Sequence, residues 1–290
     1  IKNDLIEASK ILPEVPDNKR LGTAVSGSAK TLLGKVYLTL KDYDNAVKIL
    51  KEVIDSQQYT FIQDYTELFD VDNKNNSESI FEIQYTEAVT DLGSAFANLF
   101  APIGSSEVTG GIGATEGNNE PTQNFYESYN IDDLRRDVSI GQLADGRIYC
   151  KKFVKKPVLP NQSNANFVVL RYTDVLLMYA EALNEISYSS SGDAIKYLNE
   201  VRQRAGLQLY TSEQITGQDE FRNLIWNERR YEFAFENQRW FDLLRSGKAV
   251  EVMNKSSNGD FAIEPYQLLF PIPQNQIDIA PDVMKQNDNY

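Results

Sequence analysis

The feature that most constrains the fold of this chain is a helix-pair pattern that occurs twice, at residues 24–56 and 169–205. In the first copy, apolar residues at helical spacing lie on both sides of the short turn 41–44. So short a connection makes the two helices antiparallel neighbours, and the spacing matches a tetratricopeptide unit of about 34 residues. Gly34 and Ala180 take the small-residue position of the first helix in each copy, where we expect close helix crossings.

The sequence between the two pairs, 79–165, is predicted to be an irregular insertion. Residues 79–86 alternate between apolar and polar side chains like a short strand, and residues 121–137 resemble short helices. Residues 104–119 are rich in Gly, Ser and Thr, the composition of a long loop. Because this insertion separates the pairs, we expect them not to form a simple solenoid, and we expect the insertion to pack against them.

The C-terminal part, 219–290, is predicted to hold further helices and an extended tail. Asp219 is expected to cap the first of these helices, and Phe270, Ile272 and Ile277 are expected to order the tail. One helix face is expected to carry Leu224, Glu228, Tyr231 and Phe235. The whole pattern predicts a mostly α fold of tetratricopeptide-like antiparallel helix pairs, with a long irregular insertion and short strands, in a single domain over residues 1–290.

The chain has no histidine and one cysteine. Without histidine there is no Ser-His-Asp or Cys-His catalytic arrangement and no zinc site of ordinary type. Cys150 lies in a strand-like run and is interpreted as an inert thiol. The glycines at 110–113 lack the Lys-Ser/Thr that would follow in a phosphate-binding loop. We therefore expect no cofactor and no bound metal.

The formal net charge of −13 bears on partners. A field of that sign repels the phosphate backbone, so nucleic acid is excluded as a partner. Anionic membrane surfaces are disfavoured for the same reason.

A dense cluster of acidic and basic residues lies within 228–245. Two of its carboxylates, Glu228 and Glu236 for example, suggest the acid and base of a glycosidase. However, the signs alternate closely, so each acid has a base within reach, and a nearby base lowers the pKa of an acid. We interpret the cluster as ion pairs three and four residues apart on helices, and we expect no catalytic residue and no enzyme.

Aromatic residues in the insertion are the candidates for ligand binding, because flat apolar rings can stack against sugar rings. The candidate ligand-binding residues are Phe96, Phe100, Glu120, Phe125, Tyr126 and Tyr129. Of these, we expect Phe96, Phe100 or Tyr126 to be partly exposed to solvent.

Several separate blocks of the sequence carry a family resemblance. Residues 170–185, which read LRYTDVLLMYAEALNE, form the first, and 198–207 and 227–245 follow in order. Further blocks lie at 121–122 with 133–137, and at 271–273 with 286–287 and Tyr290. In this order the blocks resemble the SusD/RagB-like outer-membrane nutrient-binding lipoproteins of Bacteroidetes. One departure is Asn237-Gln238, where the family usually carries Gly.

The resemblance implies a surface-exposed protein that captures glycan or peptide nutrients and lies as a lid over a SusC-like TonB-dependent transporter. It implies no catalysis. Because the family's proteins are longer, this chain looks like the portion from the middle onward. A lipid anchor to the cell outer membrane would then belong to an N-terminal segment not present in this chain, so Cys150 cannot carry it.

Three functions follow as hypotheses from the sequence. The first is a non-catalytic nutrient-binding protein, with an oligosaccharide as the expected ligand, that delivers its ligand to the transporter. The second is a tetratricopeptide-type protein-interaction adaptor. The third is a carboxylate-based, all-helical glycosidase.

Overall fold

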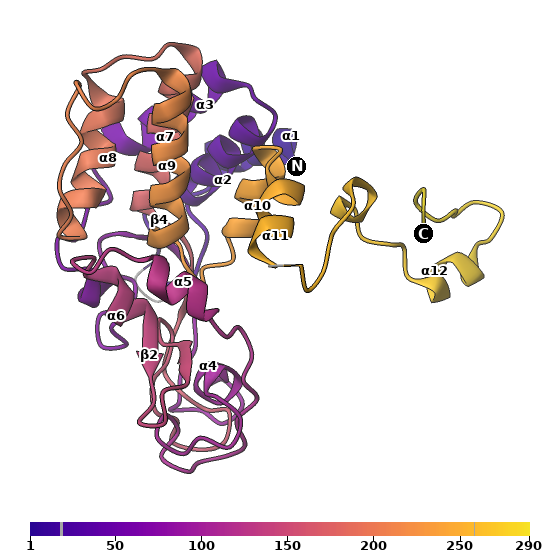
Figure 1. Cartoon of the computed structure of the whole chain (residues 1–290). Helices are drawn as coiled ribbons and strands as arrows, with labels where there is room; N and C mark the ends of the chain where they lie inside the picture. Colours follow the sequence, from indigo (N-terminus) through magenta and orange to yellow (C-terminus); the bar gives the residue numbers. More distant parts are fainter. Residues whose placement is uncertain (18–19, 258) are drawn as a thin grey trace. The chain divides into compact units, whose positions relative to one another are not determined.

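The computed structural model describes residues 1–17, 20–257 and 259–290, and it is mostly helical (Figure 1). The prediction of a mostly α fold with short strands is confirmed. The chain forms two compact units, Ile1–Glu236 and Asn237–Tyr290. The prediction of a single domain stays a prediction.

Among its described residues, the first unit has helices of very different lengths and four short strands. Its helices are α1 (Lys2–Ile11), α2 (Ser26–Thr39), α3 (Tyr43–Asp55), η1 (Tyr65–Phe69), α4 (Phe96–Phe100), α5 (Gln123–Ser128), α6 (Arg135–Ser139), α7 (Tyr172–Ile186), α8 (Asp193–Arg204) and α9 (Gln218–Glu232). Its strands are β1 (Ser79–Ile83), β2 (Ile140–Gln142), β3 (Ile148–Cys150) and β4 (Phe167–Arg171). The long helices gather at one end of this unit, and the insertion extends from them (Figure 1).

The first helix pair is α2 with α3, as predicted. Lys41 takes a left-handed conformation, with φ 58°, at the tight turn between the helices. Gly34 lies at their crossing, where an added Cβ would stand 2.4 Å from Cδ2 of Leu50. Leu50 is fully buried, so it has no free volume to retreat into. The prediction of a close crossing at Gly34 is confirmed.

The second helix pair is α7 with α8, and α7 is the central helix of the unit. One side of α7 packs with α2 and α3 in a cluster of Leu38, Ala46, Leu50, Val53, Ile80, Leu170, Val175, Met178, Tyr179 and Ala182. The other side packs with α8 and α9 in a cluster of Leu177, Ala180, Ala194, Leu198, Val201, Ile215, Phe221, Ile225 and Phe233. Residues 169–171 belong to strand β4 rather than to the helix, so the predicted start of this pair is wrong by three residues.

The two pairs are neighbours in space despite their separation in sequence. Helix α3 packs directly on α7, and the apolar cluster they share is continuous. As expected, the two pairs are not consecutive repeats of a simple solenoid, because the intervening chain leaves the helices and returns to them through β1 and β4.

The strands tie the insertion to the helices. Strand β1 pairs antiparallel with β4, with Glu82 opposite Val168, so the two ends of the insertion meet. Strands β2 and β3 form a hairpin in which Ile140 faces Cys150. Burial raises the pKa of the Cys150 thiol to about 12, which agrees with the interpretation of an inert residue.

Helix α9 differs in detail from its prediction. Its N-cap is Gly217 rather than Asp219. Its buried face carries Phe221, Ile225, Glu228, Arg229 and Glu232, so the predicted face through Leu224 and Tyr231 is shifted by about one residue. Just beyond the helix, Phe235 and Asn237 have left-handed backbone conformations, with φ of 66° and 62°. Asn237 thus supplies the left-handed backbone for which the family usually has Gly.

The second unit contains short helices and the tail. Its elements are α10 (Arg239–Arg245), α11 (Ala249–Ser256), η2 (Pro265–Leu268) and α12 (Gln274–Ile279). The side chain of Gln286 makes two hydrogen bonds with the backbone of Ile272, and the Tyr290 hydroxyl donates to the carbonyl of Leu269. Phe270 is 78% exposed, so it does not order the tail as predicted.

Candidate functional site

The candidate residues of the insertion lie in two aromatic clusters. Phe96 and Phe100 are one turn apart on α4, and their rings stack with centroids 5.5 Å apart. The Phe96 ring also contacts Tyr85, Phe153 and Phe167. Within the described chain, Phe100 has ring contact with Phe96 alone. Both side chains are half-buried, which confirms the expectation of partial exposure.

Asn98 explains how the long Gly-rich loop is held against α4. Its amide nitrogen donates to the carbonyls of Ile112 and Ala114 at 2.8 and 2.9 Å, and its amide oxygen accepts from the backbone of Asn161. Residues 104–119 contain turns and bends only, as predicted, yet this buried side chain fixes the loop from within. Asn98 is therefore a structural residue and not a ligand contact.

The second aromatic cluster is built around α5. The rings of Phe125, Tyr129 and Tyr231 lie with centroids 4.7 to 6.1 Å apart, and the Arg230 guanidinium covers the Phe125 ring at 5.0 Å. Tyr129 is only 6% exposed, and its hydroxyl donates to the carbonyl of Tyr231. Tyr129 is therefore packed within this cluster and has little exposed ring surface.

Tyr126 and Glu120 lie nearer the surface. Tyr126 is half-buried, with the Arg136 guanidinium 5.3 Å from the centre of its ring, and Glu120 is exposed. No ring contact joins the Phe96 cluster to the Phe125 cluster in the part of the chain that the structure describes. The structure thus brings Phe96 and Phe100 together, and Phe125 and Tyr129 together, but it shows no contact that unites all six candidates.

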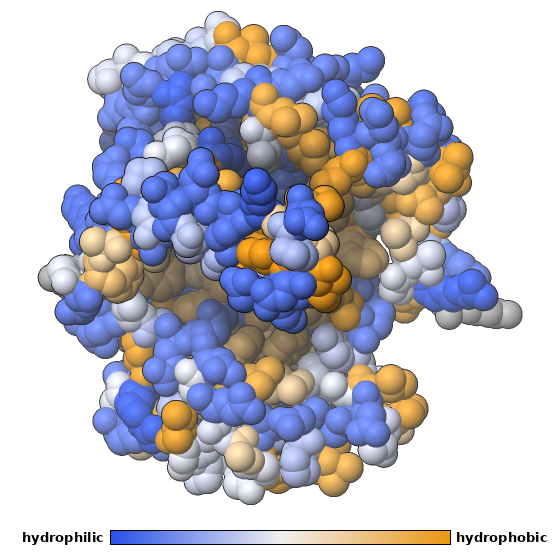
Figure 2. Space-filling view, turned by 90° about the vertical axis from the view of Figure 1, so that its right-hand side faces the viewer, coloured by the Kyte–Doolittle hydropathy of each residue, from blue (hydrophilic) through white to orange (hydrophobic). Residues whose placement is uncertain are grey.

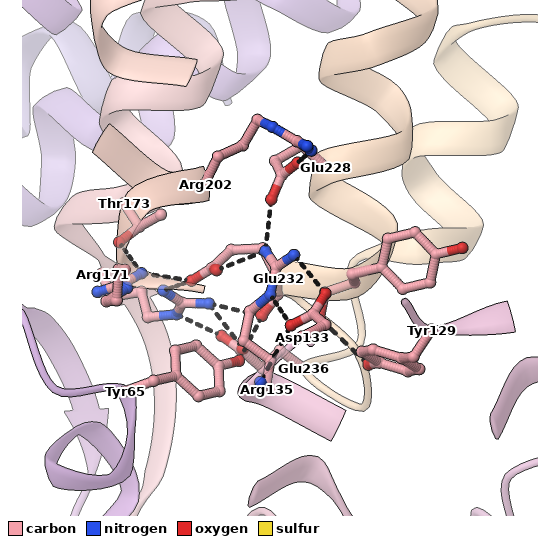
Figure 3. Close-up of polar contacts among 12 residues, drawn as sticks. Tyr65, Tyr129, Asp133, Arg135, Arg171, Thr173, Arg202, Glu228, Glu232 and Glu236 are labelled. Carbon is pink, nitrogen blue, oxygen red and sulfur yellow. Dashed lines mark hydrogen bonds and ion pairs between the residues drawn. The ribbon is translucent and has the colours of Figure 1, made fainter. Parts of the chain in front are cut away.

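A buried network of ion pairs underlies this part of the molecule (Figure 3). Glu232 of α9 is its centre: its carboxylate accepts from Arg171 and Arg204, each at 2.6 Å, and from Arg135 at 3.1 Å. Arg135 also binds Asp133 and Glu228, at 2.8 and 2.6 Å. The hydroxyl of Tyr65 donates to the Glu232 carbonyl. Because Arg135, Arg204 and Glu232 are fully buried, each charge depends on its partners.

The interpretation of these acids as pairs along one helix is only partly right. The acids Glu228, Glu232 and Glu236 pair with bases from β4, α6, α8 and the segment after β3, whereas Asp242 pairs with Arg245 three residues further along its helix, as predicted. Sequence reasoning missed Glu78, Arg135, Lys152, Arg171 and Arg204. One signal was available, because Arg171 ends an otherwise apolar strand run, where a charge needs a buried partner.

Burial and neighbouring bases act in opposite directions on the pKa of two buried carboxylates, Glu232 and Asp174. Burial alone would raise the pKa of Glu232, but Arg204, Arg171 and Arg135 outweigh burial and hold that pKa well below its usual range. Burial would likewise raise the pKa of Asp174, and Lys35 and Arg229 lower it. A general acid of a glycosidase needs a raised pKa, so these two carboxylates have the wrong protonation state for that role.

The antiparallel helix pairs place this chain in the class of tetratricopeptide-like helical scaffolds. An aromatic-rich insertion and a buried ion network are added to these pairs. Within that class, this chain belongs to the SusD family, because the family's sequence model matches residues 126–290. The predicted resemblance is confirmed.

Three similar proteins illustrate the family. SusD-like protein P2 of Formosa agariphila is 29% identical over 99% of this chain and 63% of that protein. Surface glycan-binding protein A from Bacteroides thetaiotaomicron, solved in complex with laminarihexaose, matches 99% of this chain and 69% of that chain at 27% identity and a TM-score of 0.84. A SusD superfamily protein from Parabacteroides distasonis matches 99% of this chain and 67% of that chain at 29% identity and a TM-score of 0.85.

This chain spans about 63% of the length of the P2 protein. Within the described ranges, no helix has both the length and the apolar character needed to cross a membrane.

Proposed function

We propose that this chain is part of a non-catalytic nutrient-binding protein whose ligand is an oligosaccharide. The observation that carries the proposal is its likeness, over 99% of its length, to a surface glycan-binding protein seen with laminarihexaose. The two proteins are 27% identical with a TM-score of 0.84. A chain that keeps this fold has a rigid frame on which surface loops can present a sugar site.

Phe100 and Tyr126 are the residues we propose as stacking surfaces, with Glu120 as a polar contact. Both rings are partly exposed, and each has a packing partner. The Phe100 ring stacks on Phe96, and the Arg136 guanidinium lies over the Tyr126 ring. A ring fixed in this way loses little conformational entropy when a sugar stacks on it. Phe96 and Phe125 are more enclosed by other rings, and we propose that they support these surfaces.

Binding of laminarihexaose to the full-length protein, measured by isothermal titration calorimetry, tests the proposal. Maltohexaose and cellohexaose serve as comparison ligands. Phe100→Ala should weaken binding by about 1–2 kcal/mol, roughly 5- to 30-fold, with a nearly unchanged melting temperature. The matched control is Phe261→Ala, which removes a 49% exposed ring from the second unit and should leave affinity unchanged. Failure of every neutral oligosaccharide to bind would refute the proposed ligand class.

Absence of catalysis is part of the same proposal. Glu228 is held by Arg135 and Glu236 by Arg171 in buried ion pairs, so neither side chain is free to act on a glycosidic bond. The protein should release no reducing ends from the oligosaccharides it binds. Turnover that disappears in Glu228→Gln or Glu236→Gln would contradict this expectation.

We also propose that the protein lies at the cell outer membrane, anchored by lipid through sequence outside this chain, and delivers its ligand to a TonB-dependent transporter. The family membership supports this role. Co-purification of the full-length protein with such a transporter from outer-membrane fractions tests it. Recovery of the protein in the cytoplasmic fraction would argue against it.

A further inference from the structure

The C-terminal end of α4 is joined to the Gly-rich loop and to the β2–β3 hairpin by a small apolar core. Ala101, Val108 and Leu143, one residue from each of these segments, form this buried cluster. The carbonyl of Ala101 also accepts a hydrogen bond at 3.0 Å from the backbone of Gly117, farther along the loop. Three segments therefore fix the backbone of the surface above this core.

Arg147, at the turn of the hairpin, reaches this surface. Its Nη1 donates to the carbonyl of Ile103 at 2.8 Å, just beyond the end of α4. On its other side, Nε donates to the Asp145 carboxylate at 2.9 Å, and Nη2 lies 2.8 Å from the same carboxylate. The guanidinium is thus oriented from two sides, although 46% of the Arg147 side chain is exposed.

The guanidinium of Arg147 keeps donors for a ligand. A guanidinium has five N–H groups, and the contacts with Ile103 and Asp145 use at most three of them. At least two N–H groups therefore have no partner within residues 1–17, 20–257 and 259–290. Because their orientation is already fixed, little conformational entropy is lost when they bind an acceptor.

The charges around Arg147 determine which acceptor fits. The hydrogen bond to Asp145 raises the pKa of the guanidinium, and the charges of Glu120 and Glu107 lie near enough to raise it further. All three acids are exposed. One guanidinium among three carboxylates leaves a local negative charge, so a uronate or sulfate group would be repelled. An uncharged hydroxyl group can accept from the remaining N–H groups without that repulsion.

Phe100 lies close to this donor. It is the last residue of α4, three residues before Ile103, and three residues span at most about 10 Å. One oligosaccharide of several sugars can therefore contact both the Phe100 ring and Arg147. Ile103 is 70% exposed and adds an apolar contact. The insertion forms the lower end of the molecule in Figure 1, and Figure 2 shows that hydrophilic and hydrophobic residues mix on the visible face of that end.

We propose that Arg147 is a further ligand-contact residue, whose guanidinium donates hydrogen bonds to hydroxyl groups of a neutral oligosaccharide stacked on Phe100. This inference rests on the proposed glycan-binding function and deepens it. The acids around Arg147 make the site selective for neutral glycans over anionic ones.

Isothermal titration calorimetry on the full-length protein tests this inference. The neutral probes are laminarihexaose, maltohexaose and cellohexaose, and the anionic probe is hexagalacturonate. The tightest neutral probe should bind the wild type at least about 10-fold more tightly than hexagalacturonate. Arg147→Met keeps the aliphatic stem and removes the donors, so it should weaken binding of that neutral probe about 10-fold. Arg147→Lys keeps the charge but not the planar set of donors, so it should restore little of the loss.

Lys51→Met is the matched control. Lys51 pairs with Asp55 of its own helix, as Arg147 pairs with Asp145 of its own turn, and the two pairs are similarly exposed. Both variants remove one positive charge. Lys51→Met should change affinity for the neutral probe less than about 2-fold.

A double variant separates direct contact from support of Phe100. If Arg147 only held the end of α4 in place, Arg147→Met would have no further effect in the Phe100→Ala protein. Direct contact instead predicts that Phe100→Ala/Arg147→Met binds about 10-fold more weakly than Phe100→Ala alone. The melting temperature of Arg147→Met should stay close to that of the wild type, because the side chain is exposed.

Three results would overturn this inference while glycan binding itself stands. They are an unchanged affinity in Arg147→Met, no further loss in the double variant, and tighter binding of hexagalacturonate than of the neutral probes. Failure of the wild type to bind any neutral hexasaccharide is a different outcome, because it would refute the proposed function and this inference with it.

Discussion

Glu232→Gln tests the role of the buried ion network most directly. The substitution keeps the size of the side chain but removes the charge that faces Arg171, Arg204 and Arg135. It also turns one acceptor oxygen into an amide nitrogen, a donor that would face guanidinium donors. Because all four side chains are almost fully buried, water cannot replace the lost interaction.

The expected cost follows from the kind of interaction that is broken. Removing one partner of a buried ion pair destabilises by about 3–5 kcal/mol, because the remaining charge stays buried without compensation. The arginines keep their other acids, among them Glu78, Glu228 and Glu236, so we expect the lower part of that range. Domains of this kind have about 5–15 kcal/mol in total, so the loss is a large fraction of the stability.

Urea unfolding followed by circular dichroism measures this difference. The matched control is Glu7→Gln, which breaks the Lys10–Glu7 pair between side chains that are 61% and 67% exposed. A surface pair contributes little, so this control should unfold almost like the wild type. Equal urea midpoints for Glu232→Gln and Glu7→Gln would refute the reasoning that the network stabilises the first unit.

Three further predictions follow from particular residues. The folded state holds the pKa of Glu232 below its usual 4.5, so its contribution is complete above about pH 4.5 and is lost as the pH falls below that value; the urea midpoint should drop in acid, and less so in Glu232→Gln. Gly34→Leu should overpack the crossing against Leu50 and cost about 1–3 kcal/mol, and an unchanged thermal melt would count against the packing described. Cys150, fully buried and with its pKa raised to about 12, should resist iodoacetamide in the native protein and react in denaturant, and rapid native labelling would contradict its burial.

The helix pairs could be predicted from sequence because their determinants are local. The short turn before Tyr43, the small residue Gly34 and the apolar spacing on α3 each act within about 30 residues. The start of the second pair depends instead on a contact that is distant in sequence. Leu170 and Arg171 could continue the helical pattern that follows them. They are part of a strand because they pair with β1, which lies about 90 residues earlier in the sequence.

The ion network could not be derived in the same way. Alternating signs on α9 indicate that its acids are paired, but they do not identify the bases. Arg135 lies 93 residues before Glu228, and Arg171 lies 61 residues before Glu232. Only the tertiary fold brings these side chains together. A buried amide such as Asn98 is equally hidden, because its partners are backbone groups that any sequence would have.

The network also links the scaffold to the proposed glycan surface. Arg135 opens α6, seven residues after the end of α5, and its pairs with Glu228 and Glu232 fasten that segment to α9. Lys152, which follows β3, is fastened in the same way to Glu236. The position of Tyr126 on α5 therefore depends on charges that no ligand touches. Glu232→Gln should consequently lower both stability and oligosaccharide affinity, whereas Phe100→Ala should lower affinity alone. A residue that only contacts the ligand should change affinity without changing stability. If Phe100→Ala lowers both stability and affinity, Phe100 is a core residue and not part of the binding surface.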